Sequence, residues 1–252
     1  MIYTRNGSEA LESLFVHKSV GDGREHWAAK YFGPRTSRSD APGPQATLSD
    51  MGPNETIFPH FHPATQFQLF PAGSGVIGKG KTPIVPLTVQ YKDHHTAYGP
   101  VVSGPNGLCF MALRIKTTDS APVYLSNPGY RERLKPSKRR NWLSSPVGFS
   151  TPPGLQHRKE AAWEPLFDMN KIEDEMAAHL LRLGAGMVMK GPDPKAGGGY
   201  YIFVANGSME KDGQDLPLWS MVVVESNEDG FEIRAGKKGL EALVLQFPRE
   251  ED

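Results

Sequence analysis

The stretch at residues 59–75, PHFHPATQFQLFPAGSG, decides the fold class. It contains a His-x-His pair, His60 and His62, followed by Gln66 and Gln68. On a β-strand, residues i and i+2 point to the same face, so both imidazoles are expected to enter one pocket.

Short apolar pieces separated by turn residues surround this stretch, among them ATLSDM, ETIFPHFH, IVPLTVQY and LCFMALRI. The pattern returns after residue 197 with GYYIFVANG, LWSMVVVES, GFEIRAG and LEALVLQF. The chain of 252 residues holds 27 Gly and 22 Pro, which favours many short strands joined by turns over long helices. We therefore predict an all-β fold.

Two pairs of segments repeat at nearly the same offset. Residues 69–74 (LFPAGS) match 203–208 (FVANGS), and residues 104–113 (GPNGLCFMAL) match 236–245 (GKKGLEALVL). The offsets are 203 − 69 = 134 and 236 − 104 = 132. This self-similarity predicts a duplicated β-domain. The expected boundaries are an N-terminal arm at 1–24, a first barrel at 25–116, a linker at 117–164 and a second barrel at 165–252.

The expected linker is basic and rich in Ser and Pro. It is either a solvated connector or a lid that carries cations to an anionic substrate. Its basic residues include Arg131, Arg133, Lys135, Lys138, Arg139, Arg140 and Arg158. The best helical pattern of the chain follows at 171–182, KIEDEMAAHLLR, with the alternative that this segment runs directly into a strand at 180–183.

The spacing of His60, His62, Gln66 and Gly73 resembles the first cupin motif, in which His-x-His, three or four residues, Glu, six residues and Gly build a metal site. The resemblance covers about residues 46–115. It implies two tandem cupin barrels (double-stranded β-helix or jelly-roll), with a linker and one short helix. The C-terminal repeat resembles a second, degenerate cupin barrel.

The second cupin motif supplies one more His and is poorly matched here, since the usual Pro-x-Gly before it and the Asn after it are absent. The candidates are His94 and His95. Adjacent strand residues face opposite ways, so only one of them is expected to be a ligand, and the following hairpin and apolar strand favour His95. The resemblance thus implies a metal site at His60, His62, Gln66 and His95.

Gln66 stands where the motif has Glu, which makes the predicted site more positive and its affinity for metal weaker. Gln66 either binds the metal or leaves a three-His centre. Gln68 points the same way and is expected to hydrogen-bond substrate. Tyr98 either lines the pocket mouth or packs in the barrel. The implied cofactor is a divalent transition metal, iron first, with Zn, Ni, Mn and Cu as alternatives.

The second barrel is expected to carry no metal. Shifting by 134 residues places Pro194, Ala196 and Tyr200 at the positions equivalent to His60, His62 and Gln66. None of these side chains is a ligand for a soft metal, so the second barrel is expected to be structural.

Family resemblance implies a metal-dependent dioxygenase acting on a small aromatic or diketone-like substrate, with no catalytic residue assigned beyond the metal ligands. A metal-dependent isomerase or lyase is one alternative. The other is a non-catalytic cupin that binds a small ligand or partner. One fold hosts many functions, so the substrate is not predicted.

Charge and composition limit the partners. Basic and acidic residues both number 28, so no global field directs the chain to nucleic acid or to an anionic membrane. No apolar run approaches the length of a membrane helix. A single cysteine, Cys109, and an N-terminus without a signal-peptide pattern lead us to expect a cytoplasmic protein. The resemblance to cupins also implies a homodimer, since cupins often pair edge strands across a two-fold axis.

Overall fold

The computed structural model describes residues 1–18, 25–33, 43–117 and 121–249. The chain divides into two β-units. We call Ser13–Pro146 the first barrel, and Met1–Glu12 together with Val147–Asp252 the second barrel. No helix among the described residues is long and apolar enough to cross a membrane.

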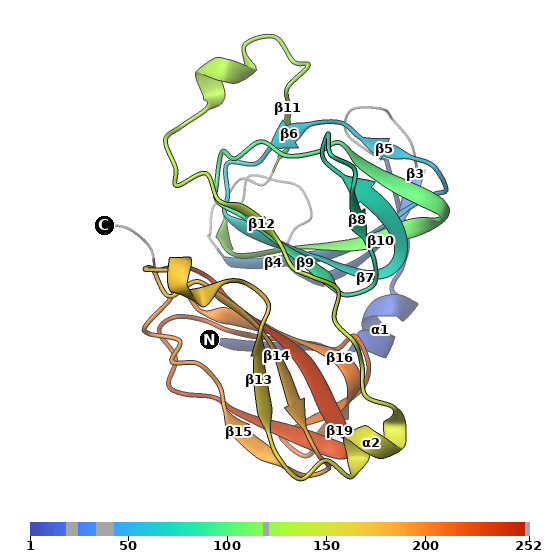
Figure 1. Ribbon diagram of the computed structural model, residues 1–252, viewed down its shortest axis with the longest axis vertical. Coiled ribbons are helices and arrows are strands. Elements are labelled where there is room, and N and C mark those ends of the chain that lie inside the picture. Colours follow the sequence, from blue (N-terminus) through green and yellow to red (C-terminus); the bar gives the residue numbers. More distant parts are fainter. Residues whose placement is uncertain (19–24, 34–42, 118–120, 250–252) are drawn as a thin grey trace. The chain divides into compact units, whose positions relative to one another are not determined.

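The regular elements described in the first barrel are strands and one 3₁₀ turn, joined by loops (Figure 1). Its elements are β2 (Phe15–Lys18), β3 (Glu25–Phe32), β4 (Gly43–Met51), β5 (Thr56–Ile57), β6 (His60–Phe61), β7 (Gln66–Ile77), β8 (Thr82–Ile84), β9 (Thr88–Lys92), β10 (Val101–Thr117), β11 (Val123–Tyr124), the 3₁₀ turn Tyr130–Arg133 and β12 (Asn141–Leu143).

The second barrel adds two short helices to a similar set of strands. Its elements are β1 (Ile2–Arg5), α1 (Gly7–Glu12), α2 (Pro152–Gln156), β13 (Ala162–Pro165), the 3₁₀ turn Met169–Lys171, β14 (Ala177–Leu183), β15 (Val188–Lys190), β16 (Tyr200–Lys211), β17 (Gln214–Leu216), β18 (Met221–Val224) and β19 (Glu232–Gln246).

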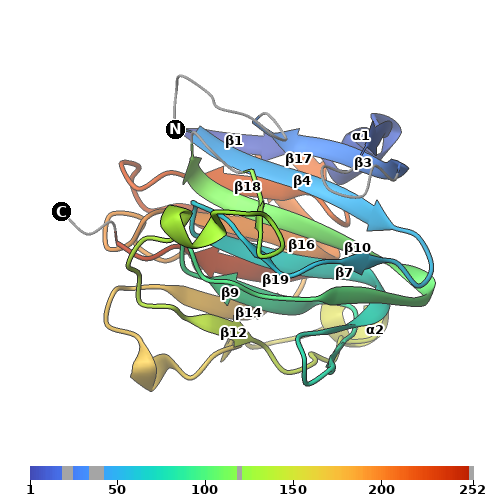
Figure 2. The same cartoon turned by 90° about the horizontal axis from the view of Figure 1, so that it is seen from above.

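The two main sheets share one topology. In the first barrel the strand order is β12-β9-β7-β10-β4-β3-β2, and in the second it is β1-β18-β16-β19-β14-β13. The central pair of long strands is β7 and β10 in one barrel and β16 and β19 in the other, and both pairs are antiparallel. Figure 2 shows β4, β10, β7 and β9 of the first barrel in this succession. The duplication predicted from the sequence is therefore present as two sheets with matching strand order.

Four glycines explain why the repeat is visible in the sequence. Gly73 and Gly107 have φ angles of 79° and 80°, and their equivalents Gly207 and Gly239 have 72° and 78°. A Cβ on Gly73 would collide with the backbone oxygen of Gly107, and a Cβ on Gly207 with that of Gly239. Both the backbone angle and the close approach of the two strands require glycine at these places.

The predicted helix at 171–182 is wrong beyond its first residue. Ala177–Leu183 is the strand β14, which lies between β13 and β19. Ile172 and Met176 precede β14, and Leu180 lies within it, where residues on both faces of the strand are buried. Pairing with two neighbouring strands overrides the weak local preference for helix.

The expected arm and linker differ from the units that the structure defines. Residues 2–5 form β1 and pair with β18 of the second barrel, although they precede the whole first barrel in the chain. Residues 123–124 and 141–143 pair with β6 and β9 of the first barrel. Much of the expected linker is therefore part of the first barrel. The loop at 34–42 lies outside the described residues.

The inner face of the first barrel changes from apolar to polar along its strands. One end is an apolar cluster that includes Met51, Phe70 and Leu108. Gln66 and Gln68 precede Phe70 at alternate positions on β7 and share its face. The same face therefore carries buried polar side chains next to the apolar core.

Candidate functional site

His60 and His62 lie close together at the end of β6. Their ring centroids are 5.0 Å apart, in an edge-to-face arrangement. The Nδ1 atom of His60 is 2.8 Å from the backbone oxygen of Phe58, which only accepts, so Nδ1 carries the proton and donates. Burial lowers the pKa of His60 to about 4, so at neutral pH this ring is uncharged and its Nε2 is an acceptor.

Gln66, the predicted fourth ligand, faces a cation. The Nη2 atom of Arg114 donates to Gln66 Oε1 at 2.6 Å, and Nη1 donates to Gln45 Oε1 at 2.6 Å. Nη2 also lies 3.4 Å from Nδ1 of His62. Arg114 is on β10 between β7 and β4, and only 4% of it is exposed. The amide oxygen that would bind a metal is therefore bound to a guanidinium.

Lys92 at the end of β9 is the second buried basic side chain, 2% exposed. Its Nζ donates to Gln68 Oε1 at 2.7 Å and to Gln90 Oε1 at 3.2 Å. The same nitrogen lies 3.2 Å from the centroid of the Tyr98 ring, so its third N–H meets an aromatic face. Burial and the charge of Arg114 hold the pKa of Lys92 well below its usual value.

Tyr98 connects these groups. Its ring packs against His60 with centroids 4.4 Å apart, and its hydroxyl accepts a long hydrogen bond of 3.4 Å from Gln66 Nε2. The backbones of His60 and Tyr98 pair as an isolated β-bridge. Burial raises the pKa of Tyr98, so its phenol stays neutral. Tyr124 on β11 closes the other side of His60, with ring centroids 5.5 Å apart.

His95 lies in a turn with a φ angle of 55° and is held by its backbone N–H, which donates to His62 O at 2.7 Å. Its ring contacts Phe61, at 5.7 Å between centroids, and its Nδ1 lies 2.8 Å from Nδ1 of His94. Phe61 alternates with His60 and His62 along the chain and faces the opposite way. The structure therefore brings His60, His62 and Gln66 together and leaves the ring of His95 on the side of Phe61.

The described residues of this site do not fit a divalent metal ion. In the described part of the chain no three His, Cys, Asp or Glu side chains are grouped as a metal would require. Arg114 contacts Gln66 and His62, both predicted ligands, and Lys92 lies beside them. A guanidinium does not lose its proton, so a metal here would add positive charge to positive charge in a buried place.

We call His60, His62, Lys92 and Arg114 the basic cluster. The metal motif drew attention to His60 and His62, while Lys92 and Arg114 were missed. Their signal is the presence of a polar residue at every second position of otherwise apolar strands, such as Gln90 and Lys92 in TVQYK. Such alternation on a buried strand marks a polar barrel interior.

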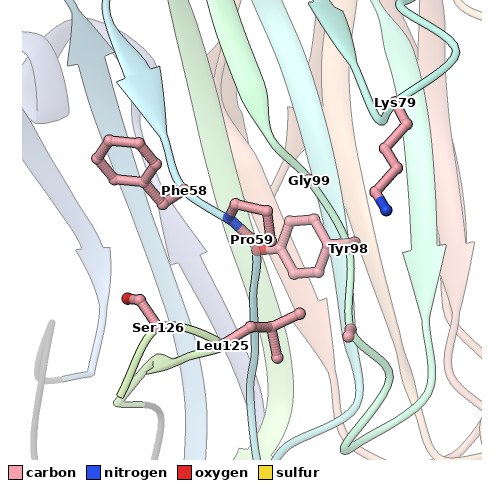
Figure 3. A pocket seen from close by; sticks show the side chains of 8 residues that line it. Phe58, Pro59, Lys79, Tyr98, Gly99, Leu125 and Ser126 are labelled. Carbon is pink, nitrogen blue, oxygen red and sulfur yellow. The ribbon is translucent and has the colours of Figure 1, made fainter.

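An apolar cavity of about 580 Å³ adjoins the basic cluster in the first barrel. It is lined by Phe58, Pro59, Lys79, Ala97, Tyr98, Gly99, Leu125 and Ser126. Figure 3 shows the rings of Phe58 and Tyr98 on either side of Pro59, with Leu125 and Ser126 facing them. Tyr98 belongs to both places, since its ring lines the cavity and also meets Lys92.

The basic segment predicted as connector or lid is anchored at one end. Arg140 forms an ion pair with Asp93 at 2.8 Å and a hydrogen bond with the Tyr91 hydroxyl at 3.1 Å. Burial and the charges of His94, Lys135, Arg139 and Arg133 lower the pKa of His95. The exposed cations of this segment therefore lie near the His94–His95 turn.

No protein-family model matches the chain, and no curated protein matches it in sequence. Solved structures do match. Salicylate 1,2-dioxygenase from Pseudaminobacter salicylatoxidans is 16% identical, with 98% of this chain and 84% of that chain covered and a TM-score of 0.60. Quercetin 2,3-dioxygenase from Acinetobacter baumannii is 14% identical, with 99% and 80% covered and a TM-score of 0.52.

Bacterial pirin YhhW from Escherichia coli, solved in complex with nickel(II), is 11% identical. The match covers 99% of this chain and 100% of the pirin chain, with a TM-score of 0.58. These structures have the cupin fold, and the match extends over nearly the whole chain in each case. The chain therefore has the two-barrel cupin fold that the resemblance of its first motif implied.

Proposed function

We propose that the first barrel binds a small organic anion, a carboxylate, at the basic cluster and that it does so without a resident metal ion. One observation carries the proposal. Lys92 and Arg114 are both buried in one barrel interior, and Lys92 donates there to the neutral amides of Gln68 and Gln90, with no carboxylate partner among the described residues.

Electrostatics supports this proposal. A buried charge is costly unless a counter-charge lies next to it. Among the described residues no carboxylate pairs with Lys92. Its pKa is lowered by burial and by the charge of Arg114, and no negative charge of a described residue raises it. The amide oxygens of Gln68 and Gln90 satisfy its N–H groups but bring no negative charge. We infer that an anionic ligand supplies that charge.

The shape of the donors favours a carboxylate. A guanidinium presents parallel N–H groups that match two carboxylate oxygens, while an ammonium adds a compact point charge. The neutral ring of His60 would accept a hydrogen bond at Nε2 from a hydroxyl of the ligand. Binding of this kind requires no chemical step, and it corresponds to the non-catalytic alternative left open by the sequence.

Thermal unfolding at constant ionic strength tests the proposal. The probes are acetate, oxalate and inorganic phosphate, added to the wild type, to Lys92→Met and to Arg114→Gln. Exposed Lys30 on β3 supplies the matched control, Lys30→Met. We expect a carboxylate to raise the Tm of the wild type and of Lys30→Met, but not that of the two cluster variants. Equal shifts in all four proteins, or none in the wild type, would refute the proposal.

A metal-dependent dioxygenase acting on a small aromatic or diketone-like substrate is the second candidate function. The proximity of His60 and His62 favours it, as do the two dioxygenases among the structural neighbours. The test is elemental analysis after loading with Fe(II), Ni(II) or Zn(II), followed by oxygen uptake with catechols and diketones. Bound metal that disappears in His60→Ala and His62→Ala would establish this candidate over the metal-free one.

The homodimer and the cytoplasmic location stay predictions. Light scattering of the purified chain at several concentrations tests the first. A fluorescent fusion imaged in cells tests the second.

A further inference from the structure

The apolar cavity lies outside the basic cluster and is a separate candidate binding site. The ring of Tyr98 lines the cavity, while Lys92 and Gln66 contact the same residue from the barrel interior. A volume of about 580 Å³ falls within the range of about 300–1,000 Å³ that is usual for small-molecule sites. The cavity is therefore large enough for a ligand of one or two rings.

Most of the cavity wall offers no hydrogen bond. Phe58, Pro59, Ala97 and Leu125 are apolar, and Phe58 is 57% exposed although it is a large aromatic residue. An exposed aromatic ring at the rim of an apolar hollow favours a ligand with a flat apolar body, because ring faces stack and water is displaced.

Two polar groups in the lining are available to a ligand. The ammonium of Lys79 and the hydroxyl of Ser126 make no hydrogen bond or ion pair with any described residue. Lys79 is the cation of the lining, which contains no acidic residue. Charge complementarity therefore calls for an anionic group attached to the apolar body, with Ser126 adding a neutral donor.

We propose that this cavity is a second binding site, for a small aromatic carboxylate, in which the ring packs against Phe58, Pro59 and Leu125 and the carboxylate pairs with Lys79. The site goes beyond the proposed function, because its cation and its apolar wall are separate from Lys92 and Arg114.

Isothermal titration with benzoate tests this site. We expect benzoate to bind the wild type and to bind Lys79→Met about tenfold more weakly, as expected for loss of a charge-assisted hydrogen bond. Lys81→Met is the matched control, since Lys81 is exposed in the same hairpin but does not line the cavity. Leu125→Trp should fill the cavity and abolish binding, with folding checked by thermal unfolding.

Benzyl alcohol, which has the ring without the charge, keeps the test informative if a variant fails to fold. It should bind the wild type about tenfold more weakly than benzoate, and Lys79→Met should not weaken it further.

Three results would overturn the second site. The first is no binding of benzoate to the wild type. The second is equal affinities of Lys79→Met and Lys81→Met. The third is loss of benzoate binding in Lys92→Met with Lys79→Met unaffected, which would place the carboxylate in the basic cluster and so support the proposed function while excluding this site. Retention of benzoate binding in Lys92→Met, with loss in Lys79→Met, supports the cavity independently of the cluster.

Discussion

The two barrels pair their strands in the same way but have different interiors. In the first barrel, Gln66 on β7 pairs with Lys92 on β9, and Gln68 pairs with Gln90. At the equivalent places of the second, Tyr200 pairs with Val224 and Ile202 with Val222. The second set belongs to a continuous apolar core. The same strand framework therefore also forms around an apolar interior, so the polar residues of the first barrel are not needed to form the fold.

At a second pair of equivalent positions, the second barrel has the charged residue and the first barrel does not. In the second barrel, Glu241 on β19 is fully buried and bonded to Arg182 and Asn206. In the first barrel the matching position on β10 is Cys109, which lies beside Asp50. Each barrel thus contains buried polar groups. In the second barrel buried Arg182 meets the carboxylate of Glu241, whereas in the first barrel no carboxylate pairs with Lys92 among the described residues. The contrast at Lys92 is what supports the proposal of an external anion in the first barrel.

Removing the buried Glu241 carboxylate of the second barrel should have the largest effect on stability. Glu241→Ala leaves buried Arg182 with less counter-charge and removes the acceptor for Ser150 and Asn206. We expect a loss of about 3–5 kcal/mol in the free energy of unfolding. Chemical denaturation measures it.

The control for this variant is Glu232→Ala, an exposed carboxylate on the same strand, which should change stability by less than about 0.5 kcal/mol. A loss of only that size in Glu241→Ala would show that the buried ion pair adds little.

Acid should destabilise the first barrel through His60. The pKa of His60 in the folded protein is about 4, below the ordinary value of 6.5, so the folded state favours the neutral ring. The stability that the neutral His60 ring contributes is fully present above pH 6.5 and is lost as the pH falls through 4. A pKa lowered from 6.5 to about 4 corresponds to a loss of about 3 kcal/mol in the free energy of unfolding.

Denaturation of the wild type and of His60→Gln between pH 7 and pH 4 measures this loss. The stability of the wild type should fall more steeply than that of the variant. His179 of the second barrel, whose pKa burial also lowers, contributes to both proteins alike. Parallel curves would contradict the burial of a neutral imidazole at position 60.

Making the first barrel more like the second should stabilise it. Lys92→Met removes a buried charge that has no described carboxylate partner and should raise the free energy of unfolding by about 1–3 kcal/mol. The gain should shrink as the pH rises toward 10.5, because the lysine of the folded wild type loses its proton below that value. Urea denaturation at pH 7 and pH 9.5 measures both effects, with Lys30→Met as the control that should show neither.

The framework of the fold could be predicted from the sequence because glycine leaves a local signature. The repeat at offsets of 134 and 132 follows Gly73 and Gly207 and then Gly107 and Gly239, whose φ angles exclude most other residues. The apolar replacement of Gln66 by Tyr200 was predicted from the same offset and agrees with the register of β16.

The polar interior could not be predicted in the same way. Arg114 meets Gln45 and Gln66 because β10 lies between β4 and β7, and that strand order is a long-range property. The direction of the His95 ring also depends on tertiary structure. The prediction places His95 in a strand, where its side chain would face either the pocket or the opposite side. The residue instead lies in a turn with a φ angle of 55°, and its ring contacts Phe61. Local spacing identified His60 and His62 but not the basic side chains beside them.

The ionisation of Lys92 tests the central claim most directly. In protein labelled with ¹³C at the lysine ε-carbons, Lys92 is assigned by the signal that is missing in Lys92→Met, and its pKa is followed with and without excess oxalate. An anion bound at the basic cluster stabilises the ammonium, so we predict a pKa well below 10.5 in the free protein and a clear rise with oxalate. A pKa that oxalate leaves unchanged would contradict an anion site in the first barrel.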